Sequence, residues 1–266
     1  MLARLLTYPE MAAALSAVVA LILGEHYFPT VRVMATAALI ALSLTTLTQR
    51  HLEENRTAIW ERKRSPYEAN FNLALYFVKI IAAIFVVSCV FDWVCMDPSR
   101  AVGWQEPRYI NDFGTLFTHN CGVLLACGLL SLVYGSGALT LVLTWNALNW
   151  SESLTPVLYQ STETLTSRLV STAALLPHLT CEVMAYVLSG MVGVFLGKAL
   201  MKYNIMSPEF YRVSRACVVI IAISVVTLIL GSWFEVSLGG SAAFSHHGAI
   251  GFGENQTYAT NEMLGR

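Results

Sequence analysis

Long apolar runs separated by short polar stretches dominate this chain. A helix that rises ~1.5 Å per residue needs about 20 apolar residues to cross the ~30 Å hydrocarbon core of a bilayer. The pattern predicts an all-α fold, a polytopic transmembrane helical bundle of about seven spans. The expected spans are residues 8–25, 30–48, 72–95, 115–134, 137–151, 176–197 and 216–236.

Turn and capping residues stand between several of these runs. Pro29 is expected to end the first helix, and Thr30 is placed to cap the next one. Gly135 and Gly137 predict a tight break between the fourth and fifth spans. The fifth span, 137–151, is short. Three interpretations stay open for it: a tilted helix, a helix buried among its neighbours, or a segment that spans the membrane only in part.

Composition supports the membrane class. Apolar residues make up 56% of the chain, and charged residues only 12%, which is about half the charged fraction of a typical soluble domain. The net charge of −1 excludes a strong general attraction to nucleic acid. The six cysteines lie in or beside apolar runs without the spacing of a zinc site. We interpret them as small buried hydrophobes and expect no disulfide framework.

Basic residues set the expected orientation. With the N-terminus inside, the inner loops hold roughly twice as many Lys and Arg residues as the outer loops, as is typical of cytoplasmic loops. The prediction is therefore an integral membrane protein with N-inside/C-outside orientation. The polar segment 49–70 then faces the cytoplasm, and its middle is expected to form a short surface helix that ends near Pro66.

The same pattern suggests three parts of the chain. Residues 1–110 hold the first helical hairpin, the charged cytoplasmic segment and the third span. Residues 111–238 form the membrane domain that carries most of the intramembrane polar groups. Residues 239–266, rich in Gly, Ser and Asn, are expected to form a flexible extracytoplasmic tail. Asn255 in this tail opens a glycosylation sequon whose use the sequence leaves open.

The clearest polar group in a span is the stretch Pro177-His178-Leu179-Thr180-Cys181-Glu182. Pro177 fits the first turn of a helix. His178 and Glu182 are four residues apart and share one helix face. A charge at the centre of a span costs ~2.5–3.5 kcal/mol, so this pair is expected to have a role. A structural ion pair, a proton or ion relay, and a metal site completed by His26 or His119 all remain open.

Two further sets of residues favour helix packing. Asn120 and Asn146 are expected to form hydrogen bonds between helices, worth ~0.6–2 kcal/mol each, or else to line a polar pathway. Ser189, Gly193 and Gly197 form a small-xxx-small face, against which we expect another helix or a second copy of the chain.

The remaining candidates are weaker. Lys79 lies in the third span, where it is expected either to pair with Glu182 or to extend to the membrane surface. The pair His246-His247 in the tail suggests a metal site only faintly. The sequence has no nucleotide-binding, zinc-protease or serine-hydrolase motif, so we expect no cofactor, no metal and no catalytic residues.

Two of these stretches resemble the stage II sporulation protein M family of membrane proteins. The first is Phe117-x-x-Asn120 with Gly135-x-Gly137 and Asn146. The second, more specific stretch is Leu176-Pro177-His178 with Glu182, Ala185 and the Gly-rich run to Gly197. The chain departs from the family pattern at Leu179 and at Ser151-Glu152. The resemblance implies a membrane scaffold, since the sporulation member acts as one in a peptidoglycan-remodelling complex.

Three functions follow as hypotheses. The first is a non-catalytic membrane scaffold or assembly subunit, whose partners are other membrane proteins, a second copy of itself and lipids, but not nucleic acid. The alternative is a permease or channel-like subunit with a polar route through His178, Glu182, Asn120 and Asn146, which would need a separate ATPase if transport were ATP-driven. The third is a membrane enzyme using His178 and Glu182 as acid and base, which is disfavoured because no nucleophile accompanies them.

Overall fold

The computed structural model describes residues 8–61, 65–95, 113–159 and 165–239. These residues form an all-helical bundle, as predicted, with one 3-10 turn, η1 (Pro29–Val31), and one π-helical turn, η2 (Glu235–Gly239). The α-helices in this part of the chain are α2 (Pro9–Tyr27), α3 (Arg32–Trp60), α4 (Pro66–Cys95), α6 (Phe113–Tyr134), α7 (Ser136–Tyr159), α8 (Leu165–Lys202) and α9 (Pro208–Phe234).

Six of these helices are long and apolar enough to cross a membrane, namely α2, α3, α4, α6, α8 and α9. The seventh, α7, has 24 residues, so its length of about 36 Å also suffices. Its polar residues Thr140, Thr144, Ser151 and Thr155 are buried inside the bundle, which explains why the apolar signal of the sequence is short there. Of the three interpretations of this span, the structure supports a helix buried among its neighbours.

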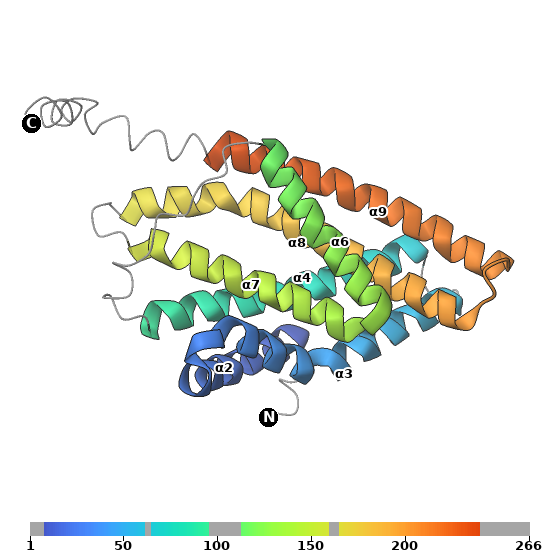
Figure 1. Cartoon of the computed structure of the whole chain (residues 1–266), viewed down its shortest axis with the longest axis horizontal. Helices are drawn as coiled ribbons and strands as arrows, with labels where there is room; N and C mark the ends of the chain where they lie inside the picture. Colours follow the sequence, from blue (N-terminus) through green and yellow to red (C-terminus); the bar gives the residue numbers. More distant parts are fainter. Residues whose placement is uncertain (1–7, 62–64, 96–112, 160–164, 240–266) are drawn as a thin grey trace, which may run out of the picture.

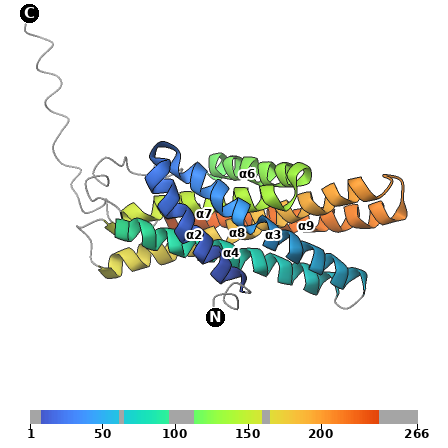
Figure 2. The same cartoon turned by 90° about the horizontal axis from the view of Figure 1, so that it is seen from below.

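The helices run back and forth along the long axis of the bundle (Figures 1 and 2). The α2–α3 turn, the end of α4, the end of α7 and the start of α8 lie at one end, on the left in Figure 1. The α8–α9 connection lies at the opposite end, and the α6–α7 turn lies on the same side of the bundle but well short of that end. We call the first the α2–α3 end and the second the α8–α9 end. The predicted orientation puts the α8–α9 end in the cytoplasm, and that orientation stays a prediction.

The predicted helix breaks are partly confirmed. Gly135 adopts a φ of +68° and is the single residue between α6 and α7. This left-handed conformation favours glycine, so the tight break is confirmed there. The prediction that Thr30 caps the second helix was wrong, because Thr30 belongs to η1 and the residue before α3 is Val31, which makes no side-chain capping bond.

Two helices are longer than the sequence pattern indicated. The charged segment after residue 49 does not form a separate surface helix, because α3 continues through it to Trp60 without a break. Pro177 was expected in the first turn of a helix, and that prediction was wrong. It lies inside α8, which begins at Leu165. A proline lacks the backbone N–H that would donate to the carbonyl four residues earlier, so one helical hydrogen bond is absent there.

Candidate functional site

The predicted pair of His178 and Glu182 is present, and a third residue completes it. On α8, Nε2 of His178 lies 3.5 Å from Oε2 of Glu182. The same nitrogen lies 3.0 Å from Oε2 of Glu235, at the start of η2. The other ring nitrogen, Nδ1, lies 3.2 Å from the backbone oxygen of Gly231 on α9. One imidazole therefore joins two carboxyl groups and fixes the end of α9 against α8.

Glu182 is also held from its own helix and from α7. The hydroxyl of Tyr186 donates to Oε1 of Glu182 over 3.3 Å, and Trp150 is a further hydrogen-bond donor to this carboxyl group. The rings of Trp150 and Tyr186 stack with centroids 6.5 Å apart. Both Glu182 and Tyr186 are buried. This shell of donors holds the carboxyl group in one place.

A cavity of about 580 Å³ lies between α6 and α7, with α8 as its floor. In Figure 1, α6 crosses obliquely and meets α7 at the Gly135 turn. The residues along this α6–α7 groove include three predicted ones, Asn120, Asn146 and Glu182. The structure thus brings both predicted polar constellations into one site. The groove is lined by His119, Asn120, Val123, Ala126, Leu141, Val142, Trp145, Asn146, Asn149, Trp150, Glu182 and Tyr186.

The two predicted asparagines differ in their hydrogen bonds. Asn146 donates from Nδ2 to the backbone oxygen of Val142 over 2.8 Å, within its own helix. Asn120 is only 4% exposed, and its Nδ2 has no hydrogen-bond partner. Buried amide groups are normally hydrogen-bonded, so an unpartnered donor that lines a cavity points to a missing acceptor.

The seam between α6 and α8 fixes one wall of the groove. Ser189 donates to the backbone oxygen of Leu124 over 2.8 Å. A side chain at Gly193 would overlap the backbone of Gly128, and one at Gly197 would overlap the backbone of Leu132. The small-xxx-small face therefore packs against another helix, as predicted, and that helix is α6 of the same chain.

Other predicted site residues lie outside this groove. Lys79 is exposed on α4, and no ion pair joins it to Glu182 in the described part of the chain. Gly135 forms the α6–α7 turn and Gly137 lies in the first turn of α7, so neither lines the groove. Among the described residues no group of three His, Cys, Asp or Glu side chains is arranged to hold a metal ion. His246, His247 and Asn255 fall outside the described residues.

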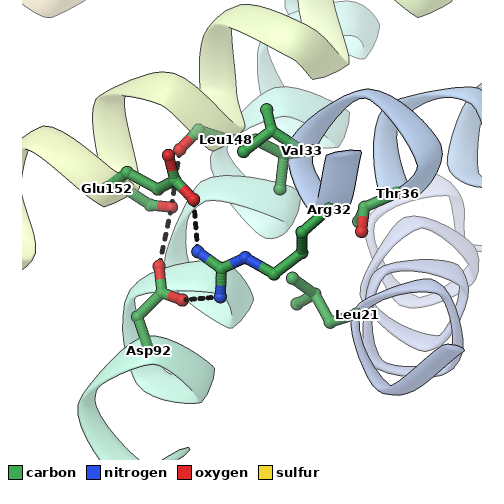
Figure 3. A pocket seen from close by; sticks show the side chains of 8 residues that line it. Leu21, Arg32, Val33, Thr36, Asp92, Leu148 and Glu152 are labelled. Carbon is green, nitrogen blue, oxygen red and sulfur yellow. Dashed lines mark hydrogen bonds and ion pairs between the residues drawn. The ribbon is translucent and has the colours of Figure 1, made fainter. Parts of the chain in front are cut away.

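A second charged cluster was missed by the sequence reasoning. Arg32, at the first position of α3, lies 3.1 Å from Asp92 of α4 through Nη1 and Oδ1, and its Nη2 binds Glu152 of α7 (Figure 3). Glu25 of α2 lies 3.5 Å from the same guanidinium. Ser151 donates to Asp92 over 3.2 Å. The Arg32 cluster thus ties four helices together at the α2–α3 end.

The sequence did hold a signal for this cluster. Asp92 is an acid near the end of the most apolar of the N-terminal runs, where an unpaired charge would be costly. Arg32 follows a proline turn and opens an apolar helix, a position from which its guanidinium can reach the ends of neighbouring helices. The space beside the cluster is about 10 Å³, which is room for roughly one water molecule.

Helices of this length and apolarity, in which the buried acids Asp92 and Glu182 are both paired, define a polytopic helical membrane protein. A sequence model of the stage II sporulation protein M family matches residues 72–238, more than half of the chain. The chain belongs to that family, as its Pro-His and Asn stretches suggested. The match includes α4 as well as α6 to α9. No curated protein and no solved structure matches the chain significantly.

Proposed function

We propose that the chain is a non-catalytic membrane scaffold, an assembly subunit that holds other proteins of a larger complex in a prokaryotic cytoplasmic membrane. The observation that carries this proposal is the pair of helical hairpins, α3–α4 and α8–α9, at the α8–α9 end. With 29, 30, 38 and 27 residues, these helices are about 40–57 Å long, well beyond the ~30 Å of hydrocarbon.

The tip of the α3–α4 hairpin combines charge with exposed aromatic rings. Arg50 and Glu54 form an exposed pair at 2.8 Å, and the tip is tied across by Asn55 and Asn70 at 3.2 Å. Tyr67 is 84% exposed. Charged side chains are costly in lipid, so this tip lies in water, and exposed tyrosine and arginine side chains are enriched in protein-binding surfaces.

The tip of the α8–α9 hairpin is equally accessible. Met206 is 91% exposed in the connection, and Tyr211 is exposed one turn into α9. Methionine adapts to irregular partner surfaces, and tyrosine is enriched in binding hot spots. Lys198 of α8 lies 4.0 Å from Glu53 of α3, so the two hairpins are joined through their charged flanks. Together they offer one surface to a cytoplasmic partner.

Site-specific photo-crosslinking in the native membrane tests the proposal. A photoreactive amino acid at Tyr67 or Met206 should give protein adducts of defined size. The same amino acid at Leu42, which is 75% exposed on the apolar part of α3, should give none, because lipid is expected there. Absence of protein adducts at both hairpin tips, with normal expression of the variants, would contradict a scaffold that recruits partners through them.

A second candidate function is a permease or channel-like subunit. The observation that favours it is the groove, which joins Asn120, Asn146 and Glu182 in one cavity. A solute route would have to continue from this groove toward the α8–α9 end. Cysteines introduced at Ala126 in the groove and at Leu132 on the α6 seam should both react with a polar thiol reagent if such a route exists. Reaction at Ala126 alone would restrict the groove to a binding role.

A further inference from the structure

The α6–α7 groove contains an acidic side chain but no lysine or arginine. The acid is Glu182, and the lining also contains the titratable imidazole of His119. Behind Glu182 stand only His178 and a second acid, Glu235. If both carboxyl groups ionise, their two negative charges exceed the single positive charge that His178 can carry, so a cation that enters the groove finds an acid to bind. Within the described ranges no lysine or arginine forms an ion pair with either acid.

The walls near Glu182 suit a cation rather than a bare proton. Trp145 is partly exposed in the groove, and the stacked rings of Trp150 and Tyr186 lie beside the acid. Aromatic faces attract cations, by about 0.5–2 kcal/mol each. Nδ2 of Asn146 donates a hydrogen bond to the backbone oxygen of Val142. The side-chain oxygen of Asn146 is therefore left as an acceptor for a donor in the groove. An ammonium ion offers both the charge and the donors.

The rest of the groove indicates what the cation is attached to. Val123, Ala126, Leu141 and Val142 form an apolar wall. The unpartnered Nδ2 of Asn120 needs an oxygen acceptor. A volume of about 580 Å³ lies within the ~300–1,000 Å³ range of small-molecule sites. The ligand therefore carries an ammonium group, an oxygen acceptor and an apolar portion.

We propose that the α6–α7 groove binds an organic ammonium ion, with the ammonium group against the Glu182 carboxylate. Two sources share this chemistry: a free amine such as an amino alcohol, and the ethanolamine headgroup of a membrane lipid. The proposal is independent of the scaffold role, because the hairpin tips that carry that role lie at the other end of the bundle.

Calorimetric titration of the purified full chain in detergent tests the ligand class. Propylammonium should bind, and propanol and propionate should not, at the same concentrations. Glu182→Gln should weaken propylammonium binding by roughly tenfold or more, the cost of removing one charged partner from a partly enclosed site. The matched control is Glu152→Gln, which removes an acid of the Arg32 cluster at the same end of the bundle and should leave the affinity unchanged.

Three results would overturn the proposal. They are equal binding of propanol and propylammonium, no binding of propylammonium at all, and equal loss in Glu182→Gln and Glu152→Gln. If Glu182→Gln fails to fold, Trp145→Leu takes its place. This variant changes only a partly exposed wall residue and should weaken propylammonium binding several-fold, whereas unchanged binding would contradict a contact between the cation and this wall.

Lipid nanodiscs separate the two sources. In discs of phosphatidylglycerol alone, the groove should bind propylammonium. Addition of phosphatidylethanolamine to the discs should displace the amine if the headgroup is the ligand, and it should leave the amine affinity unchanged if a free amine is the ligand. The displacement, where it occurs, should be absent in Glu182→Gln. Loss of amine binding in every disc would again overturn the site.

Discussion

The Arg32 cluster and the His178–Glu182–Glu235 cluster both hold buried carboxyl groups between helices, but they differ in their cation and in the space beside it. In the Arg32 cluster a guanidinium sits between carboxylates, and the space left is about 10 Å³. In the groove an acid held by His178, Tyr186 and Trp150 borders a cavity of about 580 Å³. A guanidinium has five donors and can bind several carboxyl groups at once, so the Arg32 cluster closes on itself, whereas an imidazole has only two ring nitrogens and the space beside Glu182 stays open. We therefore interpret the Arg32 cluster as a structural clasp that holds helices together, and the groove beside Glu182 as a binding site.

The largest effect is expected when the clasp loses its cation. Arg32→Ala leaves Asp92, which is 3% exposed, without its partner and should lower the free energy of unfolding by about 3–5 kcal/mol. Thermal unfolding in detergent measures this. Arg50→Ala is the control, since its exposed pair with Glu54 is worth only about 0.3–0.5 kcal/mol. Equal melting of the two variants would mean that the clasp does not stabilise the bundle.

The next effect concerns the seam that fixes the groove wall. Gly193→Ala places a methyl group against the backbone of Gly128 and should force α6 away from α8, at a cost of about 1–3 kcal/mol. The matched control is Gly122→Ala on α6, where no atom lies within 4 Å, so stability should stay the same or rise by about 0.5–1 kcal/mol. Similar melting temperatures for both would argue against close backbone contact at this seam.

A smaller effect is expected for the acid of the groove. Glu182→Gln keeps an oxygen that can accept from Tyr186 and leaves His178 with Glu235, so the free energy of unfolding should change by about 1 kcal/mol or less. Chemical unfolding of the variant beside Arg32→Ala makes the comparison direct. If both variants lose similar stability, the two clusters are both clasps and the distinction between them fails.

The smallest effect is expected at the unpartnered amide. Asn120→Leu removes a buried donor without a hydrogen bond, so stability should stay the same or rise by up to about 1 kcal/mol. The same variant should bind less propylammonium carrying a hydroxyl group than the parent chain does, as measured by calorimetry. A marked loss of stability would show that Asn120 has a partner that holds the fold together.

Much of the fold followed from the sequence, because apolar length is a strong signal in membrane proteins. The same signal predicted too short a span for α7, because the polar residues of this helix face other helices rather than lipid. The position predicted for Pro177, in the first turn of a helix, was wrong because a proline is tolerated inside a helix that neighbouring helices support. The end of α3 was misjudged because charge alone does not end a helix that has no proline or glycine to interrupt it.

The site was predictable in its parts but not in its assembly. Spacing of four residues was enough to pair His178 with Glu182. Nothing local joins Glu235 to them, since it lies 53 residues further along the chain than Glu182 and reaches His178 only because α9 packs on α8. Asn120, Asn146 and Glu182 come together through the oblique path of α6, which depends on the glycines of the seam.

Because Gly135 is the single residue between them, α6 and α7 form a V whose apex is this turn. The two helices are the arms of this V. They meet at Gly135, and the groove lies where they diverge. Any increase in the angle between α6 and α7 is a rotation about Gly135. Ser136, the first residue after Gly135, lies 3.4 Å from Gln49 of α3, just where α3 enters its charged tip. A shift of α7 relative to α6 would therefore be passed on through this contact to the part of α3 that leads into the charged tip.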